Sequence, residues 1–280
     1  MKKAIIALII IGLAWALYPF YQSYQAKKNL EERKVLEAEH REKGGYKATT
    51  VEECINEEAC VWYAFEGIAF GTELEEDKVF HSKLINKREE NLEILLMTDI
   101  SEYHYRLVKT FLNKIEDLVP FKILFANEPS NPEFYLFVSS QPNKDVKFLF
   151  SKDLLSIDET GTIWNKLVNT FYNTNAQCFG KVFLFDKNQI GYGFIFLNTN
   201  IFEACLEEEL VQSLGLMNDI NGFQFSAFND GAIIKMTKLD WLLFEVLYDD
   251  RIKAGMNINE VQEIFPQIYQ DKLTNYGDSQ

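Results

Sequence analysis

The segment Cys205–Asp219 constrains the fold of this chain more than any other part of the sequence. Leucines recur at every fourth position and form one apolar stripe of a helix: Leu206, Leu210 and Leu214. Gly215 is suited to end that helix, because glycine readily adopts the left-handed conformation that follows many helices. Glu208 and Gln212 lie one turn apart on the opposite side. The segment therefore predicts an amphipathic helix that is packed on one side and polar on the other.

The polar positions of this helix resemble the zinc-binding helix of metallopeptidases, His-Glu-x-x-His-x-x-Gly-x-x-His/Asp, without its histidines. Glu208 and Gln212 stand at the first two ligand positions. Glu209 stands at the position of the general base, and Asn218 at the third ligand position. A catalytic zinc ion needs imidazole or carboxylate ligands at about 2 Å and an open coordination position. None of the three histidines lies in this segment, so we expect no metal and no other cofactor: His40, His81 and His104.

The residues that remain on this helix allow two interpretations. In the first, Glu208 and Gln212 share a hydrogen bond on a structural or solvated polar face. In the second, Glu208, Glu209 and Asp219 form an unusual hydrolase site with Glu209 as general base. That base would lack the nucleophile that a metal-bound water supplies. The candidate catalytic residues are therefore few, and the first interpretation is favoured: Glu208, Glu209, Gln212 and Asp219.

The N-terminus has the pattern of an export signal, with Lys2 and Lys3 before an apolar run. Counted over residues 4–21, the run reaches the lower end of the roughly 17–25 residues that a spanning helix needs. We favour an uncleaved anchor that crosses a bacterial inner membrane once and places the rest of the chain in the periplasm. The alternative is cleavage near Ala16, which would release a soluble periplasmic protein.

The four cysteines suit an oxidising compartment, where disulfides persist. They fall into two close-set pairs, Cys54/Cys60 and Cys178/Cys205. Four cysteines allow three connectivities, and the sequence does not choose among them. A bond between Cys178 and Cys205 would join the start of a predicted hairpin to the start of the 205–219 helix.

The chain divides into an anchor or signal peptide (1–23), a charged juxtamembrane helix (24–45), one α/β domain (46–276) and a tail (277–280). The charged helix, ended by Gly44-Gly45, is expected to be a solvated stalk. In the domain, periodicity and capping residues predict helices and strands as follows: helices from Thr50 to 70, from Ser101 to 115, over 163–172, from Thr237 to 248, and from Asn257 to a point before Pro266; strands over 92–98, 121–125, 134–138, 148–150, 181–185 and 190–197.

This order of elements, with a hairpin of strands 181–185 and 190–197 before the 205–219 helix, resembles the metzincin-like zinc peptidases. Three motifs also resemble a bacterial family of exported proteins defined as a domain of unknown function: Cys205–Asp219, Leu247–Met256 and Ala64–Gly71. This second resemblance covers about residues 50–260 and implies a zincin-like fold without a known activity. The expected fold class is therefore α+β, with a mixed, zincin-like sheet and a helix of the active-site type.

We accordingly expect a membrane-anchored pseudo-peptidase of the cell envelope that binds a peptide or an envelope protein. Strand 190–197, taken as an edge strand, would offer main-chain pairing to that partner. The net charge of −14 argues against nucleic acid as a partner. Two alternatives stay open: an active hydrolase with the carboxylate site, and a structural subunit of an envelope complex tethered through residues 25–43.

Overall fold

The structure is a computed structural model that describes residues 28, 31–70, 84–98, 100–126, 132–140, 178–185, 188–229 and 235–277. The predicted anchor over 4–21, strand 148–150, helix 163–172 and His81 lie outside the described residues. Within the described ranges, no helix is both long enough and apolar enough to cross a membrane.

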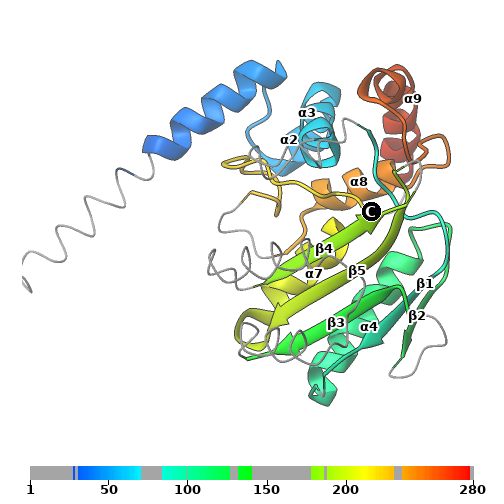
Figure 1. Ribbon diagram of the computed structural model, residues 1–280. Coiled ribbons are helices and arrows are strands. Elements are labelled where there is room, and N and C mark those ends of the chain that lie inside the picture. The colour runs from blue at the N-terminus through cyan, green and yellow to red at the C-terminus, as the bar shows by residue number, and fades with distance from the viewer. Residues whose placement is uncertain are drawn as a thin grey trace, which may run out of the picture.

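The described strands form one five-stranded mixed sheet in the order β2-β1-β3-β5-β4 (Figure 1). Four of them run parallel: β1 (Leu92–Leu96), β2 (Ile123–Ala126), β3 (Phe134–Ser139) and β5 (Ile190–Asn198). The fifth, β4 (Phe179–Leu184), pairs antiparallel with β5, which confirms the predicted hairpin.

The prediction that 190–197 forms an edge strand is wrong, because β5 lies between β3 and β4. The apolar composition of β5 accounts for its position. Seven of its nine residues are buried, including neighbours such as Phe194 and Ile195 that point to opposite faces of the sheet. β4 is the strand at that edge of the five-stranded sheet.

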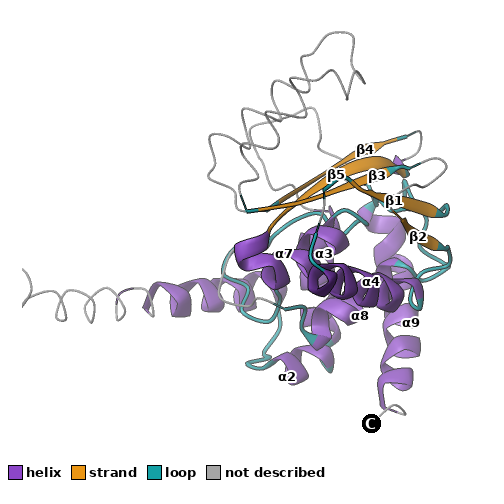
Figure 2. Cartoon of the chain, turned by 90° about the horizontal axis from the view of Figure 1, so that it is seen from below, coloured by secondary structure: helices purple, strands orange, loops and turns teal. Residues whose placement is uncertain are grey.

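Helices cover one face of this sheet (Figure 2). They are α2 (Val51–Ile55), α3 (Glu58–Phe70), α4 (Glu102–Glu116), α7 (Phe202–Gln212), α8 (Lys238–Leu247) and α9 (Ile258–Gly277), with a short 3-10 turn, η2 (Thr199–Ile201), before α7. Each predicted cap accepts a backbone N–H in the first turn of its helix: Thr50, Ser101, Thr237 and Asn257. The single helix predicted over 50–70 is two helices, α2 and α3.

α9 continues through Pro266, although the sequence predicted that it would end before this proline. A proline inside a helix removes one backbone hydrogen bond and costs about 3 kcal/mol. Buried side chains on both sides of Pro266 offset that cost: Phe265, Ile268 and Tyr269. The Tyr269 hydroxyl also donates to the Ile55 carbonyl oxygen at 2.9 Å. Tertiary packing thus maintains the helix where local propensity would end it.

Two disulfides link the described cysteines, Cys54–Cys60 and Cys178–Cys205. The second confirms the predicted bond between the start of the hairpin and the 205–219 helix, with its two α-carbons 5.9 Å apart. Both bonds are typical of an oxidising, extracytoplasmic compartment.

The charged helix, described at residues 31–44, does not behave throughout as a solvated stalk. Its N-terminal half projects from the domain (Figures 1 and 2), and residues 31–36 are exposed. Its C-terminal half lies on the domain, where His40 bonds to Tyr63 of α3 and Tyr46 is buried.

A short segment with two buried cations, Lys87 and Arg88, joins the sheet to the C-terminal helices. The Lys87 ammonium donates to the carbonyl oxygens of Leu247 and Ile252, each at 2.9 Å, and so caps the C-terminal end of α8. Burial lowers the pKa of Lys87 from its usual 10.5 to about 8.

Lys87 should make stability depend on pH in the alkaline range. Between pH 8 and 10.5 the folded protein holds fewer protons on Lys87 than the unfolded chain does, so the free energy of unfolding should rise with pH. We expect a rise of about 2 kcal/mol from pH 7.5 to 9.5 in denaturant titrations. Buried tyrosines oppose it only at higher pH, because burial raises the pKa of Tyr248 above its usual 10.0.

The Lys87→Met variant should lose this pH dependence. The exposed Lys238, at the start of α8, provides the matched control, since Lys238→Met should retain it. Equal slopes for Lys87→Met and the native protein would contradict the assignment.

Candidate functional site

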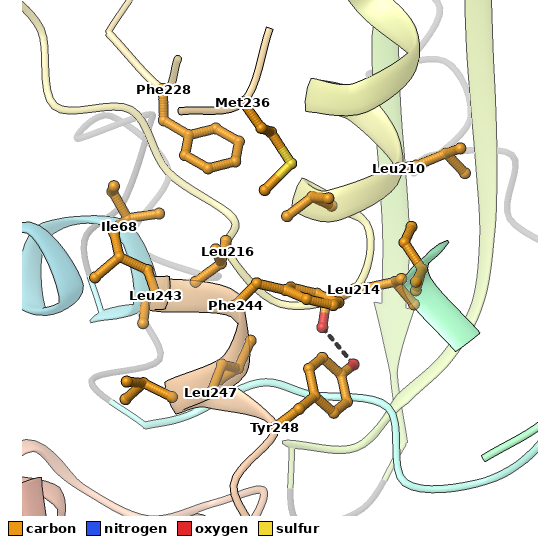
Figure 3. Packing of buried hydrophobic residues seen from close by; sticks show 14 of the residues in the cluster. Ile68, Leu210, Leu214, Leu216, Phe228, Met236, Leu243, Phe244, Leu247 and Tyr248 are labelled. Carbon is orange, nitrogen blue, oxygen red and sulfur yellow. Dashed lines mark hydrogen bonds between the residues drawn. The ribbon is translucent and has the colours of Figure 1, made fainter. Parts of the chain in front are cut away.

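The leucine stripe predicted for the 205–219 segment is buried. Leu206, Leu210 and Leu214 are each no more than 4% exposed. Figure 3 shows Leu214 beside Phe244 of α8 and the Leu210 side chain pointing away from α8, and both leucines belong to the same core cluster as α8. On its other flank, α7 contacts β4 and β5, and the Cys178–Cys205 bond fixes its first turn. The polar residues of α7 are therefore held on a rigid helix.

The chain turns away from α7 at Gly215, in a backbone conformation that only glycine fits. Its φ is +127°, and a Cβ at this position would lie 2.3 Å from the Asn86 carbonyl oxygen. The Tyr248 hydroxyl donates to the Leu214 carbonyl oxygen at 2.8 Å, the dashed line in Figure 3. The turn is thus locked by the 86–88 segment on one side and the end of α8 on the other.

This turn brings Asp219 back to the helix. Gln212 Nε2 donates to Asp219 Oδ1 at 2.9 Å, and both residues are half-buried. The sequence suggested Glu208 as the partner of Gln212, but the hydrogen bond found for Gln212 joins it to Asp219. The chain reversal at Gly215, which a helical wheel does not represent, is the physical reason.

Asn218, at the third ligand position of the zinc-binding pattern, is buried and bonded to α3. Its backbone N–H and its side-chain Nδ2 both donate to the Ile68 carbonyl oxygen, at 3.2 and 3.0 Å. This satisfies a carbonyl near the C-terminal end of α3. Asn218 therefore joins the turn to α3.

Glu209, the general-base position, lies beneath the edge strand β4 and is 9% exposed. A Cβ on Gly180 of β4 would lie 3.0 Å from Glu209 Oε2 and 2.8 Å from Ser213 Oγ. The missing side chain at Gly180 therefore lets α7 approach the strand closely. Within the described part of the chain, the buried Ser213 hydroxyl has no hydrogen-bond partner.

Two further acidic residues of α7, which the sequence analysis did not single out, bind neighbouring elements. Glu203 accepts from the Tyr103 hydroxyl of α4 at 2.6 Å, and that hydrogen bond lowers the pKa of Glu203. Glu207 accepts from the backbone N–H of Met236 at 2.8 Å. The only sequence signal was their spacing of one helical turn on a single side of α7.

The predicted Leu247–Met256 motif forms the turn between α8 and α9. Arg251 donates to both carboxylate oxygens of Asp249, at 2.7 and 2.9 Å, and reaches Asp271 of α9 at 2.7 Å. Burial acts to raise the pKa of Asp249, but the Arg251 guanidinium outweighs it and lowers the value to about 2. The ion pairs of this motif therefore stabilise the turn between α8 and α9.

The possible metal-ligating side chains of the described residues lie apart from one another. In the described ranges, no three His, Cys, Asp or Glu side chains lie close enough to hold a metal ion. His104 packs on Phe202 with ring centroids 4.4 Å apart, whereas His40 bonds to Tyr63 and the Asn221 carbonyl. The structure thus brings together Gln212 and Asp219, places Glu209 under β4, and leaves Glu208 half-buried on α7.

The contact between α7 and β4 leads to a mutational prediction. Ser213→Ala should stabilise the protein by up to about 1 kcal/mol, because it removes a buried unpaired hydroxyl. Gly180→Ala should destabilise it by about 1–3 kcal/mol through overpacking, and less in the Ser213→Ala background. A double-mutant cycle from urea unfolding measures the coupling, and strictly additive effects would refute the contact.

The chain was compared with known protein families, curated proteins and solved structures to test the predicted family. No curated protein and no solved structure matches the chain. The sequence pattern of one family matches residues 58–267, a span that includes all of β1–β5, α7 and α8. The chain therefore belongs to the family described as Protein of unknown function (DUF2927).

Proposed function

We propose that this protein is a membrane-anchored binding or scaffold module of the cell envelope, built on a zincin-like frame without zinc chemistry. One observation carries the proposal: groups at two ligand positions of the zinc-binding pattern bond within the protein. Gln212 bonds to Asp219, and Asn218 bonds to Ile68. The half-buried surface formed by Glu208, Gln212 and Asp219, here called the α7 surface, would contact a peptide or an envelope protein.

The order of elements supports the zincin-like frame. Parallel strands with an antiparallel edge strand precede α7, and the Gly215 turn and the capped helix α8 follow it. This is the order that suggested the metzincin-like peptidases from the sequence. The two disulfides support a location outside the cytoplasm, and residues 4–21 would provide the anchor.

The hydrolase alternative is weaker than the binding proposal. It requires Glu209 as general base, and Glu209 is buried. A general base needs to lie about 3 Å from the heavy atom that carries the proton it abstracts. Glu209 is buried next to β4, with its Oε2 3.0 Å from the place that a Cβ on Gly180 would occupy. If Glu209→Gln abolished a hydrolytic activity while leaving thermal stability unchanged, the hydrolase assignment would replace the present one.

Measurement of the metal content tests the proposal that the protein binds no zinc. Protein purified without chelator should contain far less than one zinc per chain by plasma mass spectrometry. The double variant Glu208→His, Gln212→His serves as the positive control, because two imidazoles one helical turn apart can share a metal. Stoichiometric zinc or iron in the native protein would overturn the proposal.

Crosslinking in intact cells tests the α7 surface. A photoreactive residue at position 208 should give a discrete adduct, whereas one at the exposed position 250 should not. Adducts that require residues 25–43 and are independent of position 208 would favour the structural-subunit alternative. Absence of any adduct at position 208 would argue against the α7 surface as a binding site.

A further inference from the structure

We propose that the N-terminal arm, residues 31–46, controls the conformation of residues 220–223 and, through them, of the α7 surface. The inference rests on the proposed role of that surface and adds its regulation. Residues 220–223 directly follow Asp219, so their position bears on the Gln212–Asp219 hydrogen bond.

His40 connects the arm to both α3 and this loop. Its Nε2 lies 2.9 Å from the Asn221 carbonyl oxygen, and its Nδ1 lies 2.6 Å from the Tyr63 hydroxyl. A carbonyl oxygen only accepts, so Nε2 carries a proton and donates to Asn221. In the neutral ring, the Tyr63 hydroxyl then donates to Nδ1. One side chain of the arm thus bonds to two elements that are distant in sequence.

Apolar contacts hold the next two loop residues. The Leu36 side chain packs over Gly222, where a Cβ would lie 3.0 Å from Leu36 Cδ1. Gly222 has φ +80°, which also favours glycine. Phe223 is buried, with its ring centroid 6.1 Å from that of His40 and 6.2 Å from that of Tyr46. The arm therefore contacts three consecutive loop residues.

α3 supports the same loop through contacts of its own. Gly67 provides space for Ile220, since a Cβ at Gly67 would lie 2.4 Å from Ile220 Cδ1. The Ile68 carbonyl accepts from Asn218, and the Tyr63 ring lies 5.9 Å from that of Phe223. Residues 218–223 are thus held by α3 together with the arm, which lie near each other in Figure 1.

The second half of the loop depends on α8 instead. The buried Asp240 carboxylate accepts from the Ser226 hydroxyl and from the backbone N–H groups of Ala227 and Thr237. Burial raises the pKa of Asp240, and these hydrogen bonds partly counter the rise. Undocking of the arm should therefore loosen residues 220–223, which keep hydrogen bonds from the Ile220 N–H to the Phe228 carbonyl and from Asn229 Nδ2 to the Phe223 carbonyl, and leave 226–228 in place.

The consequence is a mechanical link between the tether and the α7 surface. The arm projects from the domain at its N-terminal end (Figure 2), and residues 4–21, proposed as the anchor, precede it in the sequence. A displacement of that segment would act on His40 and Leu36 and so on the residues next to Asp219. The α7 surface would then take its present form only while the arm is docked.

Amide hydrogen exchange of the full-length protein in detergent, followed by mass spectrometry, tests the link. His40→Ala should speed exchange in a peptide covering 216–225 by about tenfold, because it removes two hydrogen bonds. Peptides from β1 and α8 should keep their native rates. Val35→Ala is the matched control, since Val35 is 58% exposed and adjacent to Leu36.

Faster exchange confined to residues 31–46 would overturn the proposal. If His40→Ala speeds exchange throughout the protein, the milder Leu36→Ala decides. In that variant, a rate increase in 216–225 but not in α8 supports the link, and any other pattern overturns it. Because no ligand is used, this result is independent of the crosslinking at position 208.

Discussion

The fold depends on segment 84–91, buried at residues 85–88, which joins the sheet to the helices that follow α7. Arg88 donates to the Ile190 carbonyl of β5, and the Ile190 N–H donates to the Lys87 carbonyl. Lys87 itself holds the end of α8. Backbone hydrogen bonds between Ile85 and both Gly255 and Met256 extend the connection to the turn before α9. A buried cation without partners is costly, so these contacts strongly favour a single arrangement of the sheet and the helices.

The candidate site is a consequence of that arrangement. The Asn86 carbonyl lies against Gly215, and Tyr248, beside Lys87, bonds to Leu214. Together they fix the reversal that returns Asp219 to Gln212. The polar groups of α7 therefore stabilise the fold. The same contacts determine the shape of the α7 surface that a partner would meet. This is why the helix, its turn and the helix that follows can form without a metal ion to hold them together.

Much of the fold was predictable because local patterns and local physics agree. Alternating and continuous apolar runs located all five described strands, and side-chain caps such as Ser101 and Thr237 located helix starts. The errors arose where distant contacts outweighed local preference. α9 continues through Pro266 because the neighbouring side chains are buried. β5 is an interior strand because it carries buried apolar side chains on both faces of the sheet. His40 was assigned to a solvated stalk, since nothing in a charged helix indicates that one side chain bonds to Asn221.

The sequence by itself determined the leucine stripe, the glycine turn and the close-set cysteines, because each depends on residue type and spacing within a short segment. Only the tertiary structure decided which polar groups meet. Gln212 pairs with Asp219, Glu209 lies under Gly180, and Lys87 is buried between two carbonyls. Hydrogen bonding and burial depend on groups that lie far apart in the chain, and periodicity contains no information about those distances.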